Sequence, residues 1–296
     1  MAVTLDRDRL TPAAIDQPDW AGLEWSSWCD LASIETDLTT DGPGIYRLRH
    51  PAIDGLLAVV EFDQDSMSLG SQLTELVSAV YSDREGRSVP GSGAVDAELT
   101  RGLVRTGKRL DSTVFDVSYA TPPRADRGRW FRRGLVAALI AIHRLITDRW
   151  PWPVDDDTLI RGVSKRLPPN LRTWNYWDQP RSSEWLGFDW TPPQRLEAIG
   201  ETTVPDYGIY RTWRPAEAKG TLRYVSVGDG QAIRRHRPID GNDARFSVAP
   251  IADIADASVA SSGLRMELIG AHHLAIGHPP FRQFGGNNAA DRITDK

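Results

Sequence analysis

The sequence predicts a mixed α/β (α+β) protein built from two copies of one small unit. The stretch DGPGIYRLR at 41–49 recurs as PDYGIYRTWR at 205–214. Each copy is followed by an apolar, β-branched stretch, and farther along by a helix-like segment with a Leu-Ile pair. Such internal repetition indicates a duplicated structural unit, because each copy carries the same fold-determining pattern.

The first two expected elements of each copy are the strands of a hairpin. Gly-Ile-Tyr follows a turn signal in both copies, Gly42-Pro43 or Pro205-Asp206. A polar loop then leads to LLAVVEF at 56–62 in the first copy and to LRYVSVG at 222–228 in the second. Two such runs separated by a polar loop predict paired strands.

The third expected element of each copy is a helix. The two segments are RRGLVAALIAIHRL at 132–145 and SGLRMELIGAHHLA at 262–275. Prolines follow both segments, at positions 151 and 153 and at positions 279 and 280. This is the placement expected beyond the end of a helix, because proline cannot continue one.

The chain has 296 residues, and domains commonly hold roughly 100–200 residues, so two domains are expected. We expect an N-terminal unit over 1–157, a Trp/Pro-rich connector over 158–199 and a C-terminal unit over 200–296. The first unit carries a longer insertion, over about 66–130, which includes the Gly/Ser-rich stretch PGSGA.

Composition indicates a globular protein, with 40% hydrophobic and 25% charged residues. Cys29 is the only cysteine, which excludes an internal disulfide and a cysteine zinc site. The N-terminal sequence is too polar for a signal peptide, and the longest apolar run, 135–142, is far below the ~18 residues that span a bilayer. We therefore expect a cytoplasmic protein without a membrane segment.

The order of the motifs resembles the GIY-YIG nuclease superfamily over roughly 41–157 and 200–286. The resemblance implies that each unit is a small three-stranded antiparallel sheet flanked by helices. It also implies hydrolysis of phosphodiester bonds in DNA with one divalent metal, Mg²⁺ or Mn²⁺. The family's second motif, Tyr-Ile-Gly, is eroded, since it aligns with Ser226, Val227 and Gly228 in the second copy and falls near 59–61 in the first.

The resemblance further implies a tyrosine at the attacking water, an arginine at the phosphate and a helix glutamate on the metal. The tyrosine is present twice, as Tyr46 and Tyr210. Arg234 and Arg235 follow the second motif of the second copy at about the family distance, and His236 beside them is a candidate second proton-transfer group. The first copy has no arginine in this place.

Other residues occupy the position of the family glutamate, which falls on Val136 in the first copy and on Arg265 in the second. Because Mg²⁺ needs anionic oxygen ligands, the first copy is expected to be inert. Glu267 lies two residues beyond Arg265, and side chains two apart on a helix point about 200° apart. Two interpretations stay open: Glu267 is a solvent-facing carboxylate, or it is the metal ligand.

Charge is distributed unevenly although the net charge is only −5. Residues 1–100 hold 18 acidic and 6 basic residues, and residues 101–181 hold 8 acidic and 16 basic ones. A local basic face, and not the total charge, determines phosphate binding. The basic segment is either a solvated face or part of a DNA-binding surface, for which the candidates are Arg124, Arg127, Arg129, Arg132, Arg133 and Arg237.

Tryptophans are dense over 150–190, where six of them alternate with prolines and arginines. Two interpretations remain for this aromatic surface. It packs between the two domains, or it stacks on unpaired bases with help from Arg172 and Arg181.

The leading functional hypothesis is a DNA-acting protein of nuclease descent, in restriction or other defence, that cuts through its second copy. The alternative is a catalytically inactive DNA-binding or partner-binding protein that retains only the scaffold. A third class is a structural or interaction protein, with a protein partner or as a homo-oligomer and without nucleic acid. It is favoured if the acidic first hundred residues cover the basic segment 101–133.

Overall fold

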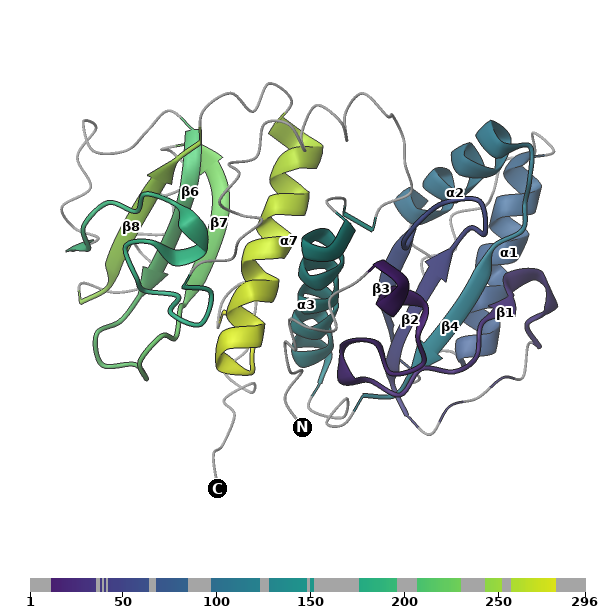
Figure 1. Ribbon diagram of the computed structural model, residues 1–296, viewed down its shortest axis with the longest axis horizontal. Coiled ribbons are helices and arrows are strands. Elements are labelled where there is room, and N and C mark those ends of the chain that lie inside the picture. Colours follow the sequence, from purple (N-terminus) through teal and green to yellow (C-terminus); the bar gives the residue numbers. More distant parts are fainter. Residues whose placement is uncertain are drawn as a thin grey trace. The chain divides into compact units, whose positions relative to one another are not determined.

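In the computed structural model the chain divides into two compact units, residues 1–164 and 165–296, shown in Figure 1. The boundary lies inside the expected connector, so residues 165–199 belong to the second unit. The structure describes residues 12–35, 38, 40, 42–63, 68–84, 97–122, 128–147, 150–151, 176–195, 207–229, 243–251 and 257–280. The described residues form α-helices and two antiparallel sheets, which confirms the mixed α+β class.

The first unit contains one sheet in the strand order β1-β4-β2-β3, with every described pair antiparallel. Its strands are β1 (Cys29–Asp30), β2 (Gly44–Arg49), β3 (Ala58–Phe62) and β4 (Asp116–Ala120). Its helices are α1 (Leu69–Arg84), α2 (Ala97–Leu110) and α3 (Arg129–Thr147). Short 3-10 turns span Pro12–Asp16, Trp20–Gly22 and Leu31–Ser33.

The core of the first unit lies between the sheet and helices α1 and α2. Leu73 and Leu76 of α1 and Leu103 of α2 pack with Phe62 of β3 and Val117 of β4, all at most 1% exposed. Helix α3 covers β3, as Figure 1 shows, and Leu135 through Ile142 are all buried. The apolar run recognised in the sequence is therefore a core helix.

The second unit repeats this sheet as β5-β8-β6-β7, again antiparallel in every described pair. Its strands are β5 (Gln194–Arg195), β6 (Tyr207–Trp213), β7 (Tyr224–Asp229) and β8 (Arg245–Pro250). Helix α7 (Ala257–Ile276) covers β7 as α3 covers β3. It ends where Gly277 takes a φ of +86° and donates its N–H to the carbonyl of His273 at 2.7 Å, a common helix stop.

Each sheet therefore has a fourth strand beyond the three expected from the resemblance. The extra strands β1 and β5 hold two residues each, and they pair with β4 and β8. Strand β4 lies inside the expected insertion 66–130, so the residues particular to the first unit are those of helices α1 and α2. Strand β4 itself is not particular to the first unit, because β8 takes the equivalent place in the second sheet.

Strand register corrects the position of the second motif in the first copy. Tyr210 pairs with Ser226, and Tyr46 pairs with Val60. Val227 and Gly228 therefore correspond to Glu61 and Phe62, one residue later than the sequence comparison placed them.

Gly44 tolerates no side chain, because an added Cβ would lie 2.3 Å from the carbonyl oxygen of Ala120.

No helix within the described ranges is both long enough and apolar enough to cross a lipid bilayer.

Candidate functional site

The first candidate, Tyr210, lies in the middle of β6 and is 2% exposed. Its ring centre is 5.8 Å from that of Tyr224, and Ser226 is its partner across the hairpin. Burial raises the pKa of the Tyr210 phenol above its ordinary value, and Tyr224 raises it further. The phenol is therefore neutral at physiological pH and is a poor general base.

Arg265 of α7 acts electrostatically on Tyr210. The positive charge of Arg265 lowers the pKa of the phenol, which places the guanidinium within electrostatic range of it. Glu267 points to a different side of the helix, because the two positions are about 200° apart. Glu267 is 1% exposed, so the interpretation of Glu267 as a solvent-facing carboxylate is wrong.

These positions do not suit a divalent metal beside Tyr210. A hard cation needs carboxylate oxygen, and the charge of α7 that acts on the phenol is the positive charge of Arg265. Among the described residues, no group of three or more His, Cys, Asp or Glu side chains is arranged to hold a metal ion. In the first unit the corresponding helix position is Val136, which is buried and apolar.

Several predicted residues lie outside the described ranges. These are Arg124 and Arg127 of the basic segment and the second-copy group Arg234, Arg235, His236 and Arg237.

Three arginines of the basic segment, all at the start of α3, are paired with acidic residues of the first hundred. Arg129 and Arg133 donate to the same oxygen of Glu61, at 3.0 and 2.7 Å. Arg132, whose side chain is only 3% exposed, pairs with Asp63 and lies 3.9 Å from Glu61. Glu61 of β3 and Asp63 just beyond this strand thus offset the positive charge at the start of α3.

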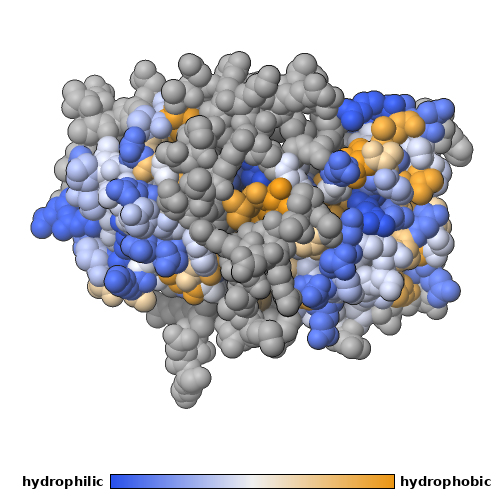
Figure 2. Space-filling model, viewed as in Figure 1, coloured by the Kyte–Doolittle hydropathy of each residue, from blue (hydrophilic) through white to orange (hydrophobic). Residues whose placement is uncertain are grey.

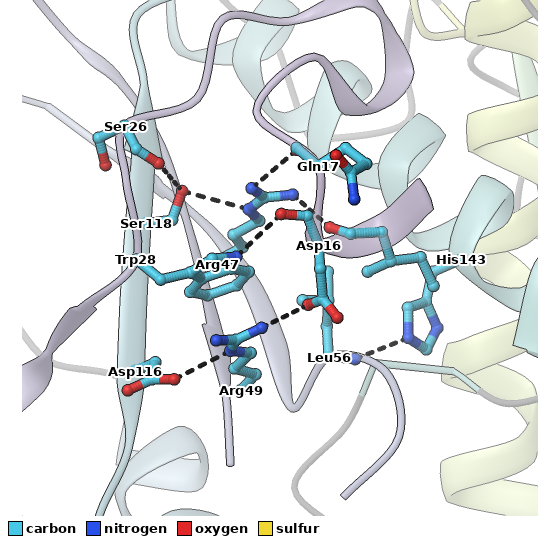
Figure 3. A network of polar contacts seen from close by, with 11 residues as sticks. Asp16, Gln17, Ser26, Trp28, Arg47, Arg49, Leu56, Asp116, Ser118 and His143 are labelled. Atoms are coloured by element: carbon cyan, nitrogen blue, oxygen red, sulfur yellow. Dashed lines mark hydrogen bonds and ion pairs between the residues drawn. The ribbon is translucent and has the colours of Figure 1, made fainter. Parts of the chain in front are cut away.

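The most heavily buried charge of the first unit is Arg47 of β2, shown in Figure 3. Its guanidinium lies 4.3 Å from the ring centre of Trp25 and 4.4 Å from that of Trp28. It donates hydrogen bonds to the backbone carbonyls of Ile15 and Gln17. Burial lowers its pKa to about 9, which leaves the group charged at neutral pH.

The second unit holds the same arrangement around Arg211 of β6. This guanidinium lies 4.0 Å from the ring centre of Trp190 and 5.8 Å from that of Trp185. It donates to the carbonyls of Pro180 and Ser182. Trp185 and Trp190 are therefore buried residues of the second unit, which excludes base stacking for these two side chains.

A sequence signal for these clusters was present and was missed. WAGLEWS at 20–26 and WLGFDWT at 185–191 match position by position. In both turns the second residue has a φ of 57°, and the indole of the later tryptophan donates to the carbonyl of the earlier one, at 3.0 and 2.9 Å. The duplication thus begins well upstream of Gly-Ile-Tyr.

A buried histidine links helix and hairpin in each unit. Nε2 of His143 accepts the N–H of Leu56 at 2.9 Å, and Nε2 of His272 accepts the N–H of Leu222 at 2.9 Å. Burial lowers the pKa of His272 to about 3, so its imidazole is neutral. In both histidines Nε2 accepts a backbone N–H of the hairpin, so this atom is not available for a ligand or for proton transfer.

Comparisons with protein-family models, curated proteins and solved structures found no match to this chain.

Proposed function

We propose that the protein binds nucleic acid through its second unit without cutting it, on a duplicated fold of nuclease descent. The resemblance of the repeated Gly-Ile-Tyr hairpin and Leu-Ile helix to a nuclease superfamily supports the class of ligand. The pairing of β6 with β7, with α7 over β7, supports a complete scaffold in the second unit.

The observation that carries the proposal is that Arg265 occupies the family glutamate position on α7, the helix that covers β7, and that its positive charge acts on Tyr210. A metal-assisted attack on phosphate needs an anionic ligand to hold the ion near the tyrosine. A cation in that place repels the ion instead, and at ~4 Å with an effective dielectric of ~20 one charge pair is worth about 4 kcal/mol. A guanidinium suits phosphate oxygens far better, because its planar fork donates two parallel hydrogen bonds to them.

Binding should be independent of divalent metal. The test is fluorescence anisotropy with short labelled duplex and single-stranded DNA, in EDTA and then in Mg²⁺, over a salt series. We expect binding in EDTA whose affinity falls steeply with salt. Absence of binding at low salt, or binding only when Mg²⁺ is present, contradicts the proposal.

A second candidate, a structural or protein-binding role without nucleic acid, is favoured by one observation in the first unit. Arg129, Arg132 and Arg133 are ion-paired with Glu61 and Asp63 and are therefore engaged within the unit. We assign this role to the first unit only. Charge reversal of Arg129 should then leave DNA affinity unchanged, while the same change in the second unit's binding residues should reduce it.

A further inference from the structure

The two sheets carry opposite charges at one equivalent corner. Strand β1 pairs with β4 through Asp30 and Asp116. Strand β5 pairs with β8 in the same place through Arg195 and Arg245. Because partners across antiparallel strands project from the same face, each corner presents two like charges side by side.

The same inversion of charge occurs in the upstream segment that Arg47 binds in the first unit and Arg211 binds in the second. Arg47 is bonded to the carbonyls on either side of Asp16, and Arg211 to the carbonyls on either side of Arg181. Asp16 and Arg181 are therefore equivalent. The first unit has three aspartates where the second unit has three arginines.

In the first unit Arg49 offsets part of the negative charge locally. Arg49 donates to Asp16 at 2.8 Å and to Asp116 at 2.9 Å, as Figure 3 shows. Arg49 also lies 4.3 Å from the ring centre of Trp28. One guanidinium thus bridges two of the three aspartates and offsets part of their charge.

In the second unit a tryptophan stands where the first unit has the balancing arginine, and among the described acids Glu217 acts on Arg181. The residue equivalent to Arg49 is Trp213, which pairs with Arg245 across the strands. In the part of the second unit that the structure describes, the ion pairs join Arg214 to Asp243 and Arg223 to Glu217, and none involves Arg195 or Arg245. Arg195 is exposed and Arg245 is half-buried. Like charges directly opposite each other destabilise a sheet, and an anion between them removes that cost.

Arg181 extends the positive charge toward the interior. Its guanidinium donates to the carbonyl of Thr221 at 2.6 Å and lies 6.0 Å from the ring centre of Trp213. Its charge also lowers the pKa of Arg211, after the larger effect of burial. Arg181 is therefore within electrostatic range of the buried Arg211.

We propose that Arg195 and Arg245, backed by Arg181, form a phosphate-binding surface that contacts the backbone of nucleic acid. The proposal rests on the proposed function and names the place where it acts. Two guanidinium groups on neighbouring strands are spaced to share one phosphate or to hold adjacent ones through bidentate hydrogen bonds.

An acidic protein surface is the other anion to consider, and the surface chemistry favours nucleic acid. Protein interfaces are anchored by buried aromatic or aliphatic side chains. Within the described ranges, the large hydrophobic side chains that are exposed are Tyr81, Val114 and Tyr176. Figure 2 shows mainly hydrophilic residues over the coloured surface of the second unit, at the left of the view.

The double variant Arg195→Asp with Arg245→Asp tests the surface. It gives β5 and β8 the like-charged pair that the first unit already carries at Asp30 and Asp116, so the fold should tolerate it. Lys219→Glu, a charge reversal at an exposed residue of the same unit, is the matched control. Arg223 is left unchanged in this control because it is ion-paired with Glu217. Circular dichroism verifies that both variants are folded.

Affinity for labelled duplex DNA in EDTA is the readout, measured over a salt series. We expect the double variant to bind at least about tenfold more weakly and to lose about 1.8 from the slope of log K against log salt, about 0.9 for each phosphate contact. Lys219→Glu should change little. The neutral pair Arg195→Gln with Arg245→Gln should also weaken binding, which keeps the test valid if the aspartate variant fails to fold.

The outcomes separate the two proposals. Wild-type binding that survives in both double variants overturns the phosphate-binding surface and leaves the proposed function standing. No wild-type binding at low salt overturns both. Competition by polyglutamate as strong as by DNA of equal charge overturns the assignment to nucleic acid in favour of an acidic protein.

Discussion

The guanidinium of Arg211 lies 4.0 Å from the ring centre of Trp190, and in the first unit Arg47 lies 4.3 Å from Trp25. Each arginine follows the tyrosine of a Gly-Ile-Tyr strand, and each tryptophan closes a turn upstream of it. The arginine and the tryptophan are far apart in the sequence, so their contact fixes the upstream turn on the face of the sheet from which the arginine projects. It is the structural element that the two units share most closely.

Replacing the buried arginine should destabilise its own unit. Arg211→Met removes the hydrogen bonds to the carbonyls of Pro180 and Ser182 and the charge over Trp190. We expect a loss of about 2–4 kcal/mol in the free energy of unfolding. Urea denaturation of the variant and of Lys219→Ala, an exposed control, measures it. Equal midpoints for the two would show that the arginine cluster contributes nothing.

The upstream turn should be required for the second unit to fold. A fragment over 165–296 includes Trp185 and Trp190, whereas a fragment over 200–296 lacks both. We expect cooperative thermal unfolding of the longer fragment and none of the shorter one, because Arg211 then loses its carbonyl partners. Circular dichroism on both fragments distinguishes them. A folded 200–296 fragment would instead support the bounds expected from the sequence, with 158–199 as a connector outside the second unit.

Acid should destabilise the second unit through its buried histidines. Burial lowers the pKa of His272 and of His273 to about 3, with His278 adding to both shifts. The unfolded state therefore binds more protons below about pH 6.5, and stability present above that pH is lost as the pH falls toward about 3. Each histidine contributes a slope of about 1.4 kcal/mol per pH unit in that window.

His272→Gln tests this dependence, because an amide oxygen can accept the N–H of Leu222 without titrating. Urea unfolding at about pH 7 and about pH 4.5 gives the stability difference for wild type and variant. We expect a smaller difference in the variant. The same difference in both proteins would mean that His272 titrates normally or makes no such contact.

Arg265→Glu should give the second unit an affinity for divalent cations that the wild type lacks. The change places a carboxylate in the environment of Tyr210, where the guanidinium now acts. Mn²⁺ should then raise the melting temperature of the variant and leave that of Arg265→Gln unchanged, since stabilisation by a ligand follows its binding to the folded state. A shift of equal size in both variants would place any metal elsewhere.

The sequence predicted the elements whose patterns are strong and local. Both Gly-Ile-Tyr segments are central strands, and both Leu-Ile segments are helices that cover the neighbouring strand. The two-residue strands β1 and β5 were missed, because so few residues give no alternation to recognise. Strand β4 was missed because it lies beyond two helices of the insertion, although DVSYA alternates as a strand should.

The site was less predictable, since it depends on side-chain direction and on burial. Helix geometry predicts different sides of α7 for Arg265 and Glu267, but nothing local in the sequence shows that Glu267 is buried. The pairing of Arg129 with Glu61 joins residues of different elements and needs the fold to be known. The charge inversion between Asp116 and Arg245 became visible only once strand register had aligned them.

Plasmid cleavage under conditions where DNA is bound tests the central claim most directly. Wild type, Tyr210→Phe and Glu267→Ala are incubated with supercoiled plasmid in Mg²⁺ or Mn²⁺, and complex formation is followed on the same samples by gel shift. The account predicts that wild type shifts the plasmid and leaves it supercoiled. Metal-dependent nicking by wild type that is abolished in Tyr210→Phe would contradict it, and loss in Glu267→Ala as well would identify Glu267 as the metal ligand.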